Sequence, residues 1–140
     1  MDYPDKVLRG ISGNFINDDG ILDGEAFQLD PVRYDGYCEI SITWLDEPKA
    51  FDVLMKQKSA TTNEIQFIYG AAEIDRLHLD TYMKPHIINK QFDYERRPTK
   101  DNPYHGNFLV LDSLEKSMKK MIKQRLALLG NAIIHSNPYV

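Results

Sequence analysis

The stretch Tyr37–Trp44, which reads YCEISITW, alternates apolar and polar side chains along its whole length. One face of an extended chain here would carry four apolar side chains: Cys38, Ile40, Ile42 and Trp44. Successive side chains of a β-strand point to opposite faces. The stretch therefore predicts a half-buried strand with a polar outer face, and the rest of the fold is inferred outward from it.

Turn signals and further short strands surround this central strand. The pairs Asp19-Gly20 and Asp35-Gly36 favour the tight turns that join antiparallel strands. Alternating, β-branched or aromatic residues predict further strands at Glu64–Tyr69, Ile87–Arg96 and Phe108–Leu111. A mainly antiparallel sheet follows from this succession of strands and turns.

Two segments carry the apolar spacing of helices. Pro48–Lys58 predicts a short helix, because proline is well suited to the first helical turn and acidic residues precede it. Residues Asp112–Leu129 predict a long helix, with apolar side chains three and four positions apart. Asp112 and Glu115 have the spacing of a capping box, and Gly130 is a suitable stop.

The sum of these elements is one α+β domain that spans residues 1–140. The prediction is a mainly antiparallel sheet with a short middle helix, and a long C-terminal helix packed on one face. Ala71–Tyr82 fits a short helix or an extended segment almost equally well, because short apolar patterns do not separate the two.

Composition limits the class of protein and of chemistry. The chain has 140 residues, a formal charge of −4 and a single cysteine, Cys38, which leaves no internal disulfide, CxxC pair or thiolate zinc site. The first ten residues lack the apolar run of a signal peptide, and no membrane-spanning stretch is present, so we expect a cytoplasmic protein that does not bind membranes. We expect Cys38 to be a small buried hydrophobe.

The sequence carries no pattern for a cofactor or a metal. The glycines form no phosphate-binding loop, and no two of the four histidines have the spacing of neighbouring metal ligands. We therefore expect no cofactor and no metal. His86 and His135 are expected to be ordinary exposed histidines.

The segment Arg97–Gly106 holds the candidate catalytic residues. It contains two prolines and a glycine, so we expect a loop, and His105 lies in it with Asp101 and Arg97 nearby. Histidine suits proton transfer at neutral pH, and His105 could act as a general base or face a phosphate, with Asp101 and Arg97 as helpers. The alternative is a structured turn in which Asn102 bonds local backbone and His105 satisfies a carbonyl.

A second candidate surface lies on the C-terminal helix. Its polar face carries four lysines: Lys116, Lys119, Lys120 and Lys123. Residues 112–140 have a charge of +3, whereas residues 1–60 have 12 acids against six bases. The lysines could bind nucleic acid or an acidic partner, or they could form an ordinary solvated face.

Several short elements together resemble small uncharacterised bacterial proteins. They are Leu8-Arg9-Gly10, Asp19-Gly20, Ala26-Phe27, Ser41-Ile42-Thr43-Trp44 and Asp101-Asn102-Pro103-Tyr104-His105-Gly106, which together span residues 8–110. The resemblance implies a prokaryotic accessory protein, and it transfers no functional residue.

The leading hypothesis from the sequence is a non-enzymatic, cytoplasmic protein-binding protein, an accessory or adaptor of a bacterial multi-component system. Its partner would be another protein or a second copy of itself. Motifs for catalysis are missing, the two ends of the chain differ in charge, and eight tyrosines suit an interface. The alternatives are a small hydrolase or nucleic-acid-processing enzyme that uses the His105 loop, and a nucleic-acid binder that uses the C-terminal lysines.

Overall fold

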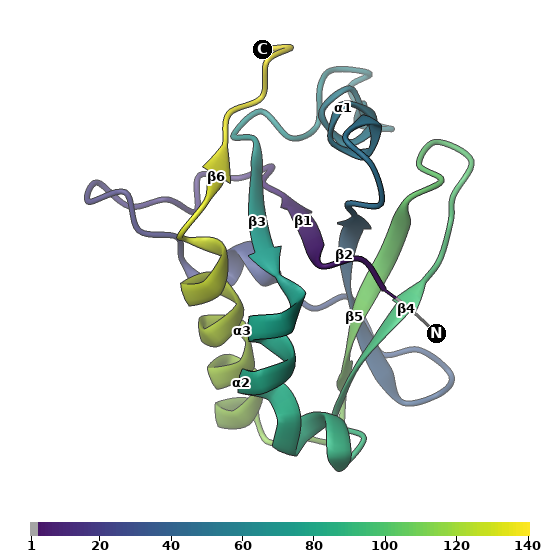
Figure 1. Cartoon of the computed structure of the whole chain (residues 1–140), viewed down its shortest axis with the longest axis vertical. Helices are drawn as coiled ribbons and strands as arrows, with labels where there is room; N and C mark the ends of the chain where they lie inside the picture. Colours follow the sequence, from purple (N-terminus) through teal and green to yellow (C-terminus); the bar gives the residue numbers. More distant parts are fainter. Residues whose placement is uncertain (1–2) are drawn as a thin grey trace.

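The computed structural model describes residues 3–140, with six strands and three α-helices (Figure 1). The strands are β1 (Lys6–Gly10), β2 (Tyr37–Trp44), β3 (Ala71–Asp75), β4 (Phe92–Arg96), β5 (His105–Leu111) and β6 (Ile134–His135). The helices are α1 (Lys49–Met55), α2 (Arg76–Ile88) and α3 (Lys116–Gly130), with a 3-10 turn, η1, at Gly24–Phe27. Met1 and Asp2, part of the stretch that lacks a signal-like apolar run, lie outside the described residues.

All six strands belong to one antiparallel sheet in the order β4-β5-β2-β1-β3-β6. This arrangement confirms the predicted α+β class. The central strand has the predicted bounds, and its apolar side chains are buried while Tyr37, Glu39 and Ser41 are partly exposed. The alternation of YCEISITW is therefore a direct record of the two faces of the sheet.

The sheet opens between β1 and β2. These strands pair only at Val7 with Trp44 and at Leu8 with Thr43, whereas β2 pairs with β5 from Tyr37 to Thr43. Beyond Leu8 the first strand turns away from the first half of β2 and continues beside β3 (Figure 1). Two strands that part in this way leave backbone groups without ladder partners, and those groups need other hydrogen bonds.

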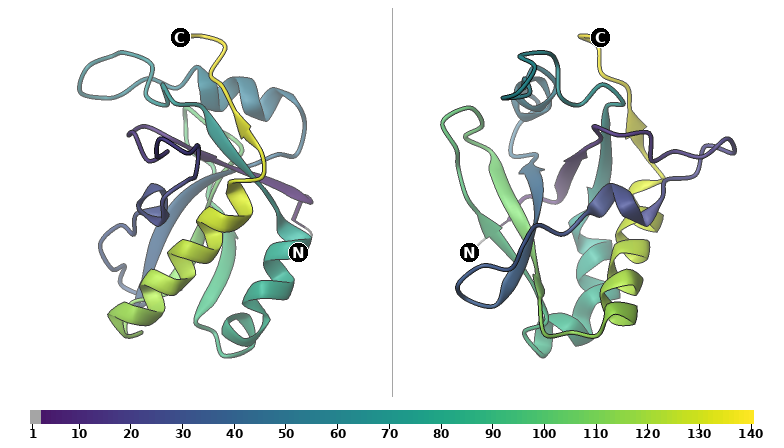
Figure 2. Two further views of the ribbon diagram at one scale, coloured as in Figure 1. Left: turned by 90° about the vertical axis from the view of Figure 1, so that its left-hand side faces the viewer. Right: turned by 180° about the vertical axis from the view of Figure 1, so that it is seen from behind.

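Helices cover both faces of the sheet. Helices α2 and α3 lie side by side over one face, as all three views show (Figures 1 and 2). The main core beneath them contains the buried side chains of Phe27, Trp44, Phe92 and Phe108. A smaller cluster under α1 holds Leu8, Leu54, Met55 and Ala71. Since neighbours along a strand point to opposite faces, the main-core residue Val7 and the α1-side residue Leu8 place α1 on the other face.

The two aspartate–glycine pairs form the expected tight turns. Gly20 has φ +79° and Gly36 has φ +87°, conformations that glycine adopts without the steric cost of a side chain. Backbone hydrogen bonds close the first turn between Asn17 and Ile21 and the second between Arg33 and Tyr37.

The predicted strand Glu64–Tyr69 is wrong. Its residues form turns, and only Ile65 makes an isolated bridge, with Lys58. The side chains of Ser59, Thr61 and Thr62 bond to nearby hydroxyl or backbone groups and fold this segment back on itself. Such local bonds compete with sheet pairing, which an alternating pattern alone does not reveal.

The predicted strand Ile87–Arg96 is correct only in its second half. Helix α2 continues through Pro85 to Ile88, and Lys90 then adopts φ +57°, the left-handed conformation that commonly ends a helix. Strand β4 begins at Phe92. The sequence of Ala71–Tyr82 fits a helix or an extended segment, and the structure contains both: β3, followed by the first half of α2.

The ends of several elements also differ from the prediction. Helix α3 begins at Lys116, and its N-cap residue Glu115 makes no side-chain capping bond. The capping box is therefore wrong, because Asp112 accepts hydrogen bonds from Lys119 and Cys38 instead. Gly130 is the last helical residue, and a Cβ there would lie 3.1 Å from Ala72 Cβ, so close packing on the sheet explains this glycine.

The predicted short helix and last strand have different lengths in the structure. Helix α1 has seven residues and ends at Met55, before the predicted end at Lys58. Strand β5 begins at His105, three residues before the predicted start at Phe108, because it pairs with β2 as far as Thr43. Within residues 3–140, no helix is both long and apolar enough to cross a membrane.

Candidate functional site

The side chain of Arg9 lies where β1 and β2 part. Its Nε donates to the carbonyl oxygen of Ala26 at 2.9 Å, and its Nη1 donates to that of Ser41 at 2.7 Å. Ser41 belongs to the part of β2 that β1 does not pair with. Arg9 thus supplies a carbonyl of the open strand with a donor and is held in place by two main-chain oxygens.

A cavity of about 240 Å³ opens beside Arg9, and we call it the Arg9 cleft. Its polar lining comes from Arg9, Ser12, Asp30, Ser41, Thr43, Gln57, Gln66, Asn102 and His105. Gly10, Ile42, Leu54 and Phe67 complete the wall. These residues come from β1 and β2 and the segments beside them, from α1 and the turns after it, and from the start of β5 and the loop before it, so parts of the chain far apart in sequence meet around one hollow.

The positive charge of Arg9 has no direct counter-charge. None of the ion pairs within residues 3–140 includes Arg9, and the acid that acts on it, Asp30, is an exposed residue of the cleft. Burial lowers the pKa of Arg9 to about 10, and Asp30 partly opposes that shift. A largely buried guanidinium that is bonded only to neutral carbonyls is stabilised when an anion approaches it.

One nitrogen of Arg9 remains available for such an anion. The hydrogen bonds found within residues 3–140 engage Nε and Nη1 and leave Nη2 without a partner. Hydrogen bonds between a guanidinium and a carboxylate or phosphate are stronger than bonds between neutral groups. The cleft thus has a fixed donor with a full positive charge.

His105 lies at the start of β5 and lines the same cleft. Its Nδ1 is 2.8 Å from the carbonyl oxygen of Arg97. A carbonyl only accepts hydrogen bonds, so Nδ1 carries the proton and the neutral ring keeps its lone pair on Nε2. The bond fixes both the tautomer and the direction of the ring.

The loop before β5 is a structured turn as well as part of the cleft. Asn102 is buried, its Oδ1 accepts from the backbone N–H of Tyr104, and its Nδ2 donates to Thr43 Oγ1 at 2.9 Å. Asn102 therefore ties the loop to β2. Asn102 and His105 make the main-chain bonds expected of a structured turn, and both residues also line the cleft.

The structure does not assemble the predicted trio of His105, Asp101 and Arg97 in one place. Asp101 is exposed and lines a different hollow, of about 610 Å³, beside Lys56 and the turn after α1. The guanidinium of Arg97 faces outward, 3.9 Å from Glu95, and only its main-chain carbonyl reaches His105. Of the three side chains, His105 alone borders the Arg9 cleft.

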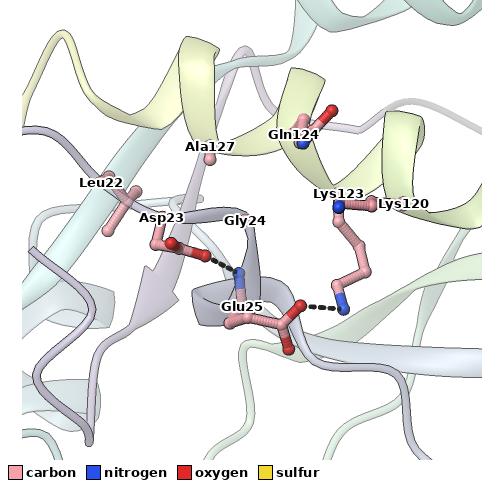
Figure 3. A pocket seen from close by; sticks show the side chains of 8 residues that line it. All are labelled: Leu22, Asp23, Gly24, Glu25, Lys120, Lys123, Gln124 and Ala127. Atoms are coloured by element: carbon pink, nitrogen blue, oxygen red, sulfur yellow. Dashed lines mark hydrogen bonds and ion pairs between the residues drawn. The ribbon is translucent and has the colours of Figure 1, made fainter.

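The four lysines of α3 do not share one uncompensated basic face. Lys119 pairs with Asp112 at 3.2 Å, and Lys123 pairs with Glu25 of η1 at 3.0 Å. Lys120 and Lys123 border a hollow of about 480 Å³, in which Glu25 reaches toward Lys123 (Figure 3). Lys116 is exposed near the start of the helix.

His86, His135 and Cys38 lie outside the Arg9 cleft. The expectation that His86 is exposed is wrong, because its ring is buried and its Nδ1 lies 2.9 Å from Gln91 Oε1. His135 is partly exposed and pairs with Glu73 at 3.0 Å. Cys38 is buried as predicted, and burial raises the pKa of its thiol, which does not suit a nucleophile.

Residues 3–140 contain no group of three or more histidine, cysteine, aspartate or glutamate side chains that could hold a metal ion.

Sequence reasoning missed Arg9 as a functional residue. Its signal was an arginine inside the apolar run of the first strand, between Leu8 and Gly10. Charged residues are rarely buried without a partner, so an arginine inside a central strand deserves a functional explanation. Gln57 and Gln66 had no comparable signal, because their place at the cleft depends on how the turns after α1 fold.

The structure is an α+β fold with a cleft at the opening of its sheet, and the cleft is lined by the largely buried Arg9. Comparison of the chain with protein-family models, with curated proteins and with solved structures gives no match. The functional assignment therefore rests on the residues of the cleft.

Proposed function

We propose that this protein works by binding, and that its ligand places an anionic group, a carboxylate or a phosphate, in the Arg9 cleft. The observation that carries the proposal is the largely buried guanidinium of Arg9, which two carbonyls hold and which, within residues 3–140, has no bond at Nη2 and no ion pair. An anion at this position recovers part of the free energy that burial of the charge costs.

The other walls of the cleft suit the neutral part of such a ligand. Ser12 and the amide of Gln66 offer hydrogen bonds, while Leu54 and Phe67 offer an apolar surface. Asp30 stands at the same hollow and limits the negative charge that the cleft accepts. A ligand with one anionic group and a small apolar or amide-bearing remainder fits these walls best.

The proposal is non-enzymatic because the cleft lacks a recognisable nucleophile pair. Within residues 3–140, neither of its serines, Ser12 and Ser41, is hydrogen bonded to His105. One observation favours a hydrolase as the second candidate: the Nδ1 bond to Arg97 leaves His105 Nε2 as a free base at the cleft. This oriented imidazole is the part of the enzyme hypothesis that the structure supports.

The anionic group could belong to either of two kinds of ligand. A free small molecule would enter the cleft alone, whereas a protein partner would insert an acidic side chain or a phosphorylated residue. The sequence favours a protein partner, and the wider hypothesis of a cytoplasmic accessory protein in a bacterial multi-component system belongs with this second kind of ligand. Copurification from the native host and the oligomeric state in solution test that wider hypothesis.

The binding test uses NMR titration with phenyl phosphate, benzoate and neutral benzyl alcohol, together with an acetylated peptide that contains one glutamate. We expect the anions to shift the amide signals of Ser12, Gln66 and His105, and benzyl alcohol to leave them unchanged. Arg9→Gln should weaken anion binding at least tenfold, while the outward-facing Arg97→Gln should retain it. Arg9→Lys keeps the charge, so it tests binding if Arg9→Gln does not fold.

Equal binding of benzyl alcohol, or equal losses in the Arg9 and Arg97 variants, would contradict the proposal. Tighter binding of the peptide than of benzoate would favour a protein partner. Hydrolysis of p-nitrophenyl acetate or bis-p-nitrophenyl phosphate that disappears in a folded His105→Gln variant would favour the enzyme instead.

A further inference from the structure

The outer wall of the Arg9 cleft depends on a segment with little regular structure. Gln57, Gln66 and Phe67 line the cleft from the turns between α1 and β3, where Lys58 and Ile65 form the one isolated bridge within residues 56–70. Gln57 Nε2 donates to Gln66 Oε1 at 3.2 Å, and the backbone N–H of Gln66 donates to the carbonyl oxygen of Gln57 at 2.9 Å. These two bonds close the wall on itself. Its later residues are joined to Ile11, directly after β1, because the backbone N–H of Tyr69 donates to the carbonyl oxygen of Ile11 at 3.2 Å and that of Ile11 donates to the carbonyl oxygen of Gly70 at 2.9 Å.

Phe67 brings this wall against β1 beside Arg9. A Cβ on Gly10 would lie 2.5 Å from Phe67 Cδ1, so the ring packs directly over the glycine backbone. Only a glycine permits this approach. The Phe67 ring is therefore the part of the wall that lies against Gly10, the residue after Arg9.

Asn137, far along the chain, holds both ends of the wall. Its Nδ2 donates to the carbonyl oxygen of Met55 at 2.9 Å and to that of Phe67 at 3.0 Å. Its Oδ1 accepts from the backbone N–H of Tyr139 at 2.9 Å. The side chain is buried, and every one of these bonds joins it to main chain.

A second contact anchors the same C-terminal segment to α1. The hydroxyl of Tyr139 donates to Asp52 Oδ1 at 2.8 Å, and Lys56 Nζ lies 5.1 Å from the centre of the Tyr139 ring. Both partners belong to α1 or follow it directly. The segment around Asn137 is thus attached to α1 by its own contacts and to Phe67 by the asparagine amide.

We infer that Asn137 is a positioning residue for the Arg9 cleft: its amide ties the end of α1 to Phe67 and so holds the cleft wall against β1. This inference rests on the proposed anion-binding function. Asn137 does not line the cleft. Its effect on a ligand passes through the main chain at Met55 and Phe67.

The experiment compares Asn137→Ala, Asn137→Asp and the exposed control Ser136→Ala with the unaltered chain. Asn137→Asp keeps the size and the acceptor of the side chain but loses both N–H donors. Hydrogen exchange is measured at Gln57, Gln66 and Tyr69, and in strands β2 and β5, and the Kd for phenyl phosphate is measured by NMR. The exchange measurement needs no ligand.

Both Asn137 variants should speed exchange at Gln57 and Gln66 at least tenfold while β2 and β5 stay protected. Both should also raise the Kd for phenyl phosphate about tenfold, and Ser136→Ala should change neither quantity. Unchanged exchange in the wall, or an equal loss of protection in β2 and β5, would overturn the positioning role. If the unaltered chain binds no anion, the proposed function fails, while the exchange result still decides whether Asn137 holds the wall.

Discussion

At the scale of the residue, Arg9 carries the functional argument. Its guanidinium lies between two main-chain carbonyls, and its charge has no ion-pair partner within residues 3–140. Its Nε and Nη1 are hydrogen bonded, whereas Nη2 makes no hydrogen bond to these residues. The same residue thus closes the gap between β1 and β2 and gives the cleft its charge.

Gly106 gives a sharp prediction at this scale. A Cβ there would collide with Trp44 Nε1 and with the carbonyl oxygen of Glu95, which are themselves hydrogen bonded at 3.1 Å. Because one partner is backbone and Trp44 is fully buried, neither atom can move aside cheaply. We expect Gly106→Ala to lower the free energy of unfolding by about 3 kcal/mol in denaturant titrations.

The matched control is Gly24→Ala, where an added Cβ would meet only ordinary contacts of 3.4 Å or more. It should change stability by less than about 1 kcal/mol. Similar losses in the two variants would show that crowding at Gly106 is not the cause.

At the scale of the element, the N-terminal caps of α2 and α3 differ from those that the sequence predicts. Asp75 ends β3 and caps α2: its Oδ1 accepts from the backbone N–H of Leu77 at 2.9 Å and of His78 at 3.3 Å. Helix α3 lacks such a cap, because Asp112 is bonded elsewhere. Helix α2 therefore has a capping residue, Asp75, that the sequence did not indicate. Helix α3 lacks the predicted cap by Asp112.

Removal of the α2 cap should destabilise the protein in a pH-dependent way. We expect Asp75→Ala to lower the free energy of unfolding by about 1 kcal/mol near pH 7, as loss of an N-cap does. The hydrogen bond from Lys6 and the bonds from the helix N–H groups lower the pKa of Asp75. A lowered folded-state pKa means that this stabilisation is complete above the ordinary value of about 3.9 and is lost as the pH falls through the folded-state value.

The measurement is the denaturant midpoint of both proteins at pH 7 and at pH 2. The difference between them should shrink at pH 2. Asp101→Ala, in which an exposed carboxylate is lost, serves as the control and should show little difference at either pH. A deficit for Asp75→Ala that does not depend on pH would contradict the role of the charged carboxylate.

The lysines of α3 make a second prediction for an element. Two of the four are paired with acids, Lys119 with Asp112 and Lys123 with Glu25, so at most Lys116 and Lys120 are available for phosphates. Any binding to duplex DNA should be weak, with a slope of about −2 or shallower in a plot of log affinity against log salt. Fluorescence anisotropy at several salt concentrations measures this slope.

Two double variants separate the paired from the available lysines. Lys116→Glu with Lys120→Glu should remove any such binding, and Lys119→Ala with Lys123→Ala should leave it nearly unchanged. A slope near −4 that depends on all four lysines would revive the nucleic-acid hypothesis.

At the scale of the whole molecule, one sheet carries the main core on one side and a small cluster under α1 on the other. Trp44 belongs to the main core and contacts Tyr3 and Tyr94. Cys38 lies on the same strand and the same face. The fluorescence of Trp44 and the reactivity of the Cys38 thiol should therefore both change when the whole core unfolds rather than when one part opens locally.

Thiol labelling and fluorescence test this prediction together. Burial raises the pKa of Cys38, so a disulfide reagent should react with it only when the core opens. Its labelling should follow the same denaturant midpoint as the fluorescence of Trp44. A Cys38→Ala, Ser136→Cys variant, with its thiol at an exposed position, should react at once, and labelling of Cys38 well below the midpoint would contradict a single cooperative core.

The sequence by itself determined the α+β class, the bounds of the central strand and the existence of the first and last helices. These features depend on the spacing of apolar side chains over a few residues, which is a local property. It failed at Glu64–Tyr69 and at the start of α3, where side-chain bonds to the backbone or to a distant lysine compete with the local pattern.

Only the tertiary structure decided where the site lies. The contacts of Arg9 with Ser41, of Asn102 with Thr43 and of Asn137 with Met55 join residues 32, 59 and 82 positions apart. No local pattern encodes them, because each depends on how strands part and how a loop returns to the sheet. The sequence proposed His105 as the centre of a loop site, and the fold placed it at the same cleft as Arg9 of β1, two strands away in the sheet.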